Sequence, residues 1–252
     1  MQNNTQKRRL SLYWFMCLLV ILQLLLWPHV RSVETRWLNI PDAPSEEFLM
    51  LSFLGDREMA YRTMGMTLQN MGDLDGHVTP IKDYDFEHLQ NWFFLLDRFN
   101  STSNFIPYLA SFYFGATQNP AQLDYVIPYL RQAAQADAGF EKWRWLVQAM
   151  FLARHRQHDM EKALKLADEL AARNDPDAPI WTKQMRAFIK ADMGEKEAAY
   201  DIIIGMLKEA AEAHNKNVDP AEIFFMKDYI CNRLLDAPQR AAHPLCQDVP
   251  QE

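Results

Sequence analysis

Apolar residues recur at helical spacing along most of the chain. Between Met160 and Ala171 they occupy positions i, i+3, i+4 and i+7, and charged residues fill the positions between them. This period of about 3.6 residues predicts an amphipathic helix with one buried face. Between Phe86 and Phe99 apolar residues instead occupy most of the circumference, which predicts a helix that is covered on several sides. We find no convincing strand pattern, so the chain is predicted to be all-α.

Capping residues and prolines divide this pattern into successive helices. Asn119 and Asp219 are each followed by a proline, an arrangement typical of a helix start. Pro128 lies well inside the helix that follows Asn119 and is expected to kink or divide it.

The N-terminal part of the chain has a different pattern. Lys7, Arg8 and Arg9 precede an apolar run from 10 to 27, and about 18 to 20 such residues cross a bilayer as a helix. We therefore predict a transmembrane signal-anchor helix at residues 10–29, in contact with the lipid bilayer. Two alternatives stay open, a cleaved signal peptide with a weak site at 30–32 and a buried core helix.

The basic residues before the apolar run also predict an orientation. Because Lys and Arg are enriched in cytoplasmic segments, the N-terminus is expected in the cytoplasm and the rest of this single-pass protein outside, on the periplasmic side if the source is bacterial. The predicted parts are a basic segment at 1–9, the anchor at 10–29, a linker at 30–44, a helical domain at 45–235 and a tail at 236–252.

The charge of the remaining chain excludes one class of partner. Residues 37–252 contain 21 Lys and Arg against 32 Asp and Glu, and the whole chain has a net charge of −7. So acidic a domain repels the phosphate backbone. Nucleic acid is therefore not an expected partner.

The chain has three cysteines and no CxxC motif. Cys17 lies inside the apolar run, where it is interpreted as a small apolar side chain. Cys231 and Cys246 lie near the C-terminal end, and they either form a disulfide that ties the tail to the last helix or remain two free buried thiols.

The stretch "MGMTLQNMGDLDG", from Met64 to Gly76, resembles the end of the first helix of a tetratricopeptide repeat. Such repeats are about 34 residues long, and their small residues let paired helices approach closely. "HDMEKALKLADEL" and "MGEKEAAYDII" resemble the turn and second helix of the same motif, with Ala163 and Ala199 36 residues apart. The residues predicted to pack the repeat are Gly65, Leu68, Gly72, Ala163, Ala167, Gly194 and Ala199. The resemblance implies a tetratricopeptide-like α-solenoid of antiparallel helix pairs, preceded here by one transmembrane helix.

Catalytic chemistry has little support in the sequence. It contains no glycine-rich phosphate loop, nucleophile elbow or HExxH motif, so we predict neither catalytic residues nor a cofactor. His155 and His158 are three positions apart, but two histidines among arginines are more typical of a solvated face than of a metal site.

Two classes of function remain. The favoured hypothesis is a membrane-anchored scaffold or adaptor that binds another protein and assembles an envelope or membrane-associated complex. Its aromatic sets at 92–99, 105–114 and 143–145 either line a peptide groove or, as is more usual at helical spacing, belong to the core. The alternative is a helical enzyme or small-ligand-binding protein in which acidic residues such as Asp83, Asp85 and Glu87 converge in a pocket.

Overall fold

The computed structural model describes residues 2–31, 40–74, 77–136, 139–212 and 219–250. It divides into two units, Met1–Leu38 and Asn39–Glu252. Part of the predicted linker, residues 32–39, lies outside the described residues.

The first unit contains helix α1 (Gln2–Arg31). The part of the chain that the structure describes includes no helix long and apolar enough to cross a membrane. The predicted transmembrane anchor at 10–29 is therefore wrong, and so are the single-pass topology, the cytoplasmic N-terminus and the exported location that were deduced from it.

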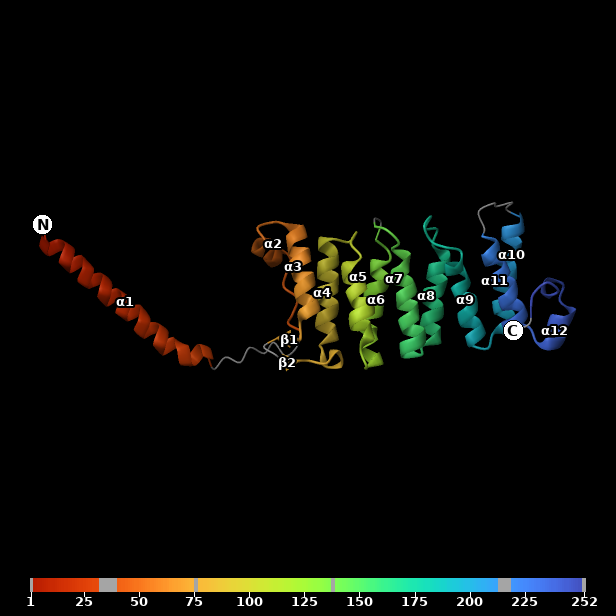
Figure 1. Cartoon of the computed structure of the whole chain (residues 1–252), viewed down its shortest axis with the longest axis horizontal. Coiled ribbons are helices and arrows are strands. Elements are labelled where there is room, and N and C mark those ends of the chain that lie inside the picture. The colour runs from red at the N-terminus through yellow and green to blue at the C-terminus, as the bar shows by residue number, and fades with distance from the viewer. Residues whose placement is uncertain (1, 32–39, 75–76, 137–138, 213–218, 251–252) are drawn as a thin grey trace. The chain divides into compact units, whose positions relative to one another are not determined.

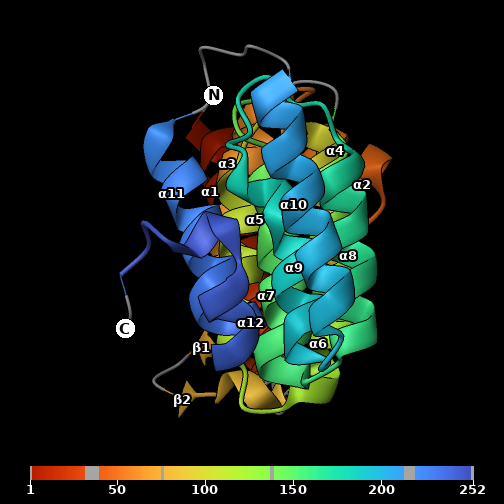
Figure 2. The ribbon, with the colours of Figure 1, turned by 90° about the vertical axis from the view of Figure 1, so that its right-hand side faces the viewer.

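The second unit is a row of helices that pack on their neighbours in chain order (Figure 1). Their connections alternate between the upper and the lower edge of the row in Figure 1, so successive helices run antiparallel. The first helices of the pairs, called the odd helices below, are α3 (Arg57–Asn70), α5 (Phe105–Tyr108), α7 (Trp143–Phe151), α9 (Trp181–Asp192) and α11 (Pro220–Tyr229). The even helices are α4 (Phe86–Phe99), α6 (Leu123–Ala133), α8 (Met160–Ala172) and α10 (Lys196–Glu212), with α2 (Glu46–Ser52) before the row and α12 (Ala237–Ala242) after it. Figure 2 looks along the row and shows its two layers, with α8 on one side and α11 on the other.

The helices recur at a nearly constant interval. Helices α5, α7, α9 and α11 begin at 105, 143, 181 and 220, which are 38, 38 and 39 residues apart, and the even helices begin 37, 37 and 36 residues apart. Three ion pairs join side chains 38 positions apart in neighbouring pairs: Lys162 with Asp124, Arg131 with Glu169, and Arg154 with Asp192. The interval is longer than the 34 residues expected of a tetratricopeptide repeat.

Short elements fill the connections. The segment between α3 and α4 contains a two-residue antiparallel hairpin, β1 (Asp73–Leu74) with β2 (His77–Val78), and the 3₁₀ turn η1 (Ile81–Asp83). This insertion is why α5 begins 48 residues after α3 and not 38. The other 3₁₀ turns are η3 (Phe114–Ala116), η4 (Pro120–Gln122) and η7 (Pro244–Cys246).

Three of the odd helices end in π-helical turns. Helix α5 continues as η2 (Leu109–Tyr113), α7 as η5 (Leu152–Gln157) and α11 as η6 (Ile230–Leu234). Such segments are rare and occur frequently at functional sites, because the wider turn redirects the side chains that it carries.

Helix α6 runs through Pro128, so the expected division of this helix is not observed. The proline removes one backbone donor, but its ring lies on the exposed side of α6, where the unpaired carbonyl can be hydrated. The opposite face of α6 is fully buried through Val126, Tyr129 and Leu130, and this packing holds the helix together.

The buried side chains form two clusters that meet at α9. The larger cluster extends from Ile40 to Ile189 and the smaller one contains Ala187, Ala199, Ile203 and the residues of the C-terminal region. Because Ala187 and Ile189 belong to different clusters, α9 is buried on two flanks. Each pair thus shares its core with the next.

The C-terminal region is fastened to α11 and η6. A disulfide joins Cys231 to Cys246, with the two Cα atoms 5.6 Å apart. The guanidinium of Arg240 donates hydrogen bonds to Asn232 Oδ1 and, at 3.1 Å, to the carbonyl of Val249. Residues 236–250 are therefore held to this region by hydrogen bonds as well as by the disulfide.

Alanine substitutions at two glycines are expected to change the free energy of unfolding in opposite directions. They test the backbone conformation that the structure gives each glycine. Gly194 has φ +86°, whereas Gly205 lies inside α10, and an added Cβ meets no atom within 4 Å at either position. We expect Gly194→Ala to lower the free energy of unfolding by about 1 kcal/mol because of left-handed strain. Gly205→Ala should raise it by about 0.5–1 kcal/mol because alanine favours the helix. Urea unfolding of both variants is the measurement, and changes of the same sign would contradict the assignment.

The disulfide gives a second prediction. The bridge closes a sequence separation of 15 residues, so replacing both Cys231 and Cys246 by alanine should destabilise the chain by about 3 kcal/mol in the chain-entropy model. Thermal unfolding with and without dithiothreitol measures the effect. Reductant should lower the midpoint of the wild type and leave the double variant unchanged; a wild type that is insensitive to reductant would contradict the prediction.

Candidate functional site

Exposed apolar side chains are distributed unequally between the two layers of the second unit. From α4 onward, those that are large and exposed are Tyr108, Phe112, Tyr113, Phe140, Phe151, Met193, Phe224 and Phe225. Each belongs to an odd helix, its π-helical continuation or an adjoining turn, and the even helices, all of them described, carry none. The layer of odd helices therefore presents an apolar face.

The even helices present a polar surface. Their exposed positions include Glu87, Arg98, Asp124, Arg131, Glu161, Lys165, Asp168, Glu197, Asp201, Lys208 and Glu209. Charged side chains of both signs keep such a surface hydrated, as is usual for the outer face of an amphipathic helix. The two layers therefore differ in their exposed side chains, which include large apolar ones on the odd helices and are mainly charged on the even helices.

One pocket, called the aromatic pocket below, lies between three odd helices. It has a volume of about 350 Å³ and is lined by Tyr108, Phe112, Trp143, Arg144, Trp145, Val147, Gln148 and Trp181. Tyr108 and Phe112 are about half exposed and lie with ring centroids 4.8 Å apart. Trp143 meets Trp181 edge-on at 5.6 Å, and its indole nitrogen is buried without a hydrogen-bond acceptor.

A second pocket, called the charged pocket below, lies further along the same helices. Its volume is about 360 Å³ and its lining residues are Arg154, Phe188, Ala191, Asp192, Lys196, Phe225, Tyr229 and Arg233. Phe188 contacts the rings of Phe225 and Tyr229, with centroids 6.0 and 4.7 Å away. The charged pocket is therefore lined by both aromatic and charged side chains.

The π-helical turns supply side chains to both pockets. Phe112 comes from η2, Arg154 from η5 and Arg233 from η6. Together the pockets and the exposed Phe151 between them define one surface, named the odd-helix groove.

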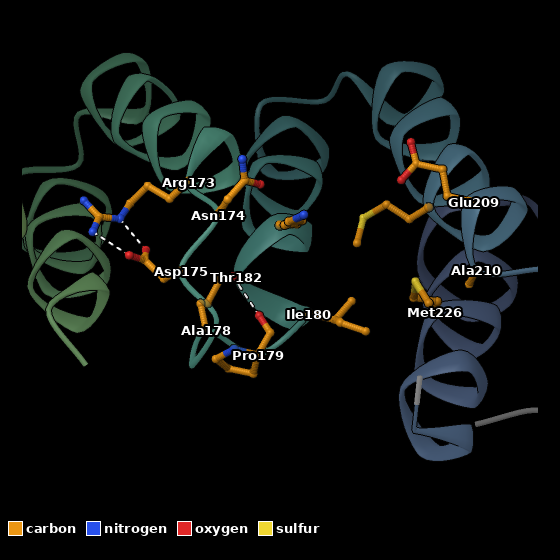
Figure 3. A pocket seen from close by; sticks show the side chains of 12 residues that line it. Arg173, Asn174, Asp175, Ala178, Pro179, Ile180, Thr182, Glu209, Ala210 and Met226 are labelled. Atoms are coloured by element: carbon orange, nitrogen blue, oxygen red, sulfur yellow. Dashed lines mark hydrogen bonds and ion pairs between the residues drawn. The ribbon is translucent and has the colours of Figure 1, made fainter. Parts of the chain in front are cut away.

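A further cleft of about 420 Å³ lies between the α8–α9 connection and helices α10 and α11. In Figure 3 Arg173 contacts Asp175, and the hydroxyl of Thr182 bonds to the carbonyl of Pro179 at 2.7 Å. Ile180 points across the cleft toward Met226. Because these polar groups are already paired with one another, the cleft offers a ligand fewer hydrogen-bond partners than its volume suggests.

The residues predicted to pack the repeat occupy different environments. Gly65 is buried, and an added Cβ would lie 2.9 Å from the ring of Phe105, so α3 and α5 approach closely there. Leu68 is fully buried. Gly72 has φ +93°, and its missing side chain makes room for the hydroxyl of Tyr84, which donates to the carbonyl of Met71.

Three predicted alanines, Ala163, Ala167 and Ala199, have no exposed surface. Gly194 is different, because it is exposed and its role is the left-handed turn between α9 and α10. Asp159 caps the equivalent helix α8 by accepting from the amide of Lys162 at 2.8 Å, and the residue before it, His158, also has a positive φ of 57°.

The histidines and acidic residues considered for chemistry are not brought together. His155 contacts Phe151 with the ring centroids 4.7 Å apart, and partial burial together with Arg154 lowers the pKa of its imidazole. Asp85 caps α4 by accepting from two backbone amides at 3.1 Å. Among the residues described, three or more potential metal ligands do not cluster anywhere.

The aromatic sets divide between core and groove. Most of the apolar side chains at 92–99 are buried in the core, whereas 105–114 contributes both core residues and the exposed Tyr108 and Phe112. The aromatic and basic stripe along α11 and its continuation η6 was not predicted, although Phe225, Tyr229 and Arg233 follow one another at i, i+4 and i+8 in the sequence. In a helix this spacing places side chains on one face, so the stripe could have been predicted from the sequence.

A pair of buried charges lies apart from the groove. Asp97 on α4 accepts a hydrogen bond from the Tyr129 hydroxyl at 3.4 Å, and the Lys142 ammonium donates to the carbonyl of Ser103 at 2.9 Å. Burial raises the pKa of the Asp97 carboxyl, which Lys142 opposes only in part, and burial lowers the pKa of Lys142. Desolvation of each charge therefore outweighs their attraction.

Comparison with protein-family models, curated proteins and solved structures gives no match.

The raised pKa of Asp97 predicts how stability changes with pH. The folded state binds this proton more tightly than the unfolded state, so the group favours folding at low pH and loses this contribution as the pH rises through its folded pKa. Asp97→Asn keeps the acceptor for Tyr129 and removes the buried charge. We expect a higher melting temperature than the wild type at pH 7 and a difference that shrinks as the pH falls below 4.

The control for this experiment is Asp168→Asn on the exposed face of α8, which should change the melting temperature little at any pH. An Asp97→Asn variant that is less stable than the wild type at pH 7 would show that the attraction to Lys142 exceeds the cost of burial.

Proposed function

We propose that this protein is a helical-repeat scaffold or adaptor that binds a segment of another protein in the odd-helix groove. The observation that supports this proposal is the asymmetry of the two layers. Exposed aromatic side chains are concentrated on the odd helices, and the even helices of the described chain carry only charged and small exposed residues together with amides and Pro128.

The physical argument begins with the cost of leaving such side chains in water. Burying apolar surface contributes about 25 cal/mol per Å², so two half-exposed aromatic rings lose a contribution of a few kcal/mol while they remain hydrated. Contiguous exposed apolar surface marks interaction sites more often than single exposed residues do. Pockets of about 350 Å³ and 360 Å³ suit side chains of a peptide better than a second folded surface.

The architecture supports the same proposal. A row of helix pairs that share their cores offers an extended surface, and such proteins act by presenting that surface to a partner. We infer that the pairs are related in architecture to tetratricopeptide repeats, on the basis of Gly65, Ala163 and Ala199 at close helix contacts. The interval of 36 to 39 residues is longer than that of the tetratricopeptide family.

The alternative of an enzyme with an acidic pocket has less support. Of its acidic residues, Asp83 and Glu87 are exposed and Asp85 serves as a helix cap. We therefore retain the binding function alone.

Photocrosslinking tests the proposed surface. p-Benzoylphenylalanine introduced at Phe112 or Phe151 should yield discrete adducts with a partner in cells that express the chain natively, because both side chains are about half exposed in the groove. The same amino acid at Lys165 or Asp168 on α8 is the matched control and should yield none. Adducts of equal abundance at the control positions, or none at the groove positions, would contradict the proposal.

A further inference from the structure

The two ends of the row of helices in the second unit differ in their exposed side chains. At the end that contains α2 and α3, large apolar side chains are exposed at Phe48, Leu51, Leu54, Met59 and Met66. At the other end, residues 226–250 are all described and carry no large exposed apolar side chain. A row of stacked helix pairs needs terminal elements with a polar outer face to stay soluble. The end formed by α2 and α3 departs from this rule, and its five exposed apolar side chains are called the leading face below.

Met59 and Met66 occupy positions that are buried in the next two odd helices. Counted from the first residue of each helix, their counterparts are Pro107 and Phe114 in α5 and its continuation, and Trp145 and Leu152 in α7 and its continuation. All four counterparts are buried, whereas Met59 and Met66 are 55% and 62% exposed. The same flank of an odd helix is therefore covered in these two pairs and open in α3.

The contacts of the counterparts show what covers this flank. The ring of Phe114 lies 5.5 Å from the ring of Phe93, which belongs to α4 in the preceding pair. The indole nitrogen of Trp145 donates a hydrogen bond at 2.8 Å to Oδ1 of Asn104, the residue before α5 in the preceding pair. The flank is therefore the surface by which one helix pair packs on the pair before it.

Helix α3 belongs to the first pair of the row, and α2 covers its flank incompletely. Helix α2 lies beside α3 at this end of the row (Figure 1), but it is seven residues long and itself exposes Phe48 and Leu51. Leu54, in the turn between the two helices, is 96% exposed and has a left-handed backbone with φ 52°. A bulky side chain is strained in that conformation, and such strain is concentrated at functional positions.

The arginines of α3 are already paired within the chain. Arg62 contacts Glu58 at 2.6 Å, and Arg57 contacts Glu46 at 3.2 Å. These two arginines are the basic residues of α3, so the helix has no free cation with which to select an acidic partner. Binding at the leading face therefore depends on apolar contact.

The leading face is large enough for an interface between two copies of the chain. A large apolar side chain contributes roughly 60–120 Å² of buried apolar surface, so five contribute roughly 300–600 Å². Apolar atoms make up about 56–65% of an interface, which gives a total of roughly 500–900 Å² for each copy. A stable complex buries about 800 Å² for each partner.

A second copy could approach the leading face in two orientations. Stacking from head to tail requires an apolar surface at the other end of the row, and residues 226–250 do not provide one. Two leading faces, in contrast, are identical apolar surfaces. Contact between them about a two-fold axis also closes after two copies, whereas head-to-tail contact continues into a filament.

We propose that the leading faces of two copies pack against each other about a two-fold axis, so that each copy supplies the neighbour that the flank of α3 lacks. The product is a dimer that carries two odd-helix grooves. This inference goes beyond the proposed function, because no residue of the leading face belongs to the groove.

Sedimentation velocity of the 252-residue chain over a range of concentrations tests the inference. The wild type should form a dimer. Met59→Lys/Met66→Lys and Met59→Glu/Met66→Glu should each raise the dissociation constant of the dimer roughly a hundredfold, because like charges would then meet in an interface that excludes water. Both positions are exposed, so the helical content measured by circular dichroism should be that of the wild type.

An equal mixture of the lysine and glutamate variants gives the most specific result. In a two-fold contact the opposite charges meet, so the mixture should form a dimer that contains one copy of each variant. In head-to-tail contact, or with another protein as the natural occupant, the leading face does not meet its own counterpart and the mixture should remain monomeric.

The matched control, Phe140→Lys/Met193→Lys, replaces two exposed apolar side chains outside the leading face and should leave the dimer intact. A monomeric wild type, a dimer that persists in both leading-face variants, or a mixture that stays monomeric would each overturn the inference. Equal loss of the dimer in the control would also overturn it, because the association would then depend on exposed apolar residues in general.

Discussion

The second unit depends on the sharing of each buried helix surface with a neighbour. Helix α9 shows this most clearly, because Ile189 belongs to one core cluster and Ala187 to the other. A single helix pair has too little surface to exclude water on its own, so stability comes from contacts between pairs. Side chains without exposed surface at Ala163, Ala167 and Ala199 allow these contacts to be close.

This sharing also determines which side chains remain exposed. The even helices are buried on one face and charged on the other, so their aromatic residues are used in the core. The odd helices keep aromatic residues on the face that no other described helix of the row covers, and the π-helical turns add Phe112, Arg154 and Arg233 to that face. Ion pairs between residues 38 positions apart, such as Lys162 with Asp124, fix the register in which these surfaces line up.

The buried pair of Asp97 and Lys142 illustrates the cost of ordering such an assembly. Both groups are desolvated, which raises the pKa of Asp97 and lowers the pKa of Lys142 and so favours the neutral form of each. The pair is therefore better understood as a constraint on the loops before α5 and α7 than as a source of stability. The ion pair of Arg154 and Asp192 is different, because both side chains are partly exposed and keep part of their hydration.

The sequence by itself determined the helical class, the capped starts at Asn119 and Asp219, and the small residues at Gly65 and Ala199, because these depend on local period, capping and side-chain size. It misled at residues 10–29, where composition alone predicted a membrane span. Of the two outcomes expected at Pro128, a kink or a division, the division is not observed, because packing of the opposite face keeps the helix continuous. Only the tertiary structure decided which aromatic residues are core and which line the groove. Phe93 and Phe112 have equal hydrophobicity, and only the position of neighbouring helices buries the first and leaves the second half exposed.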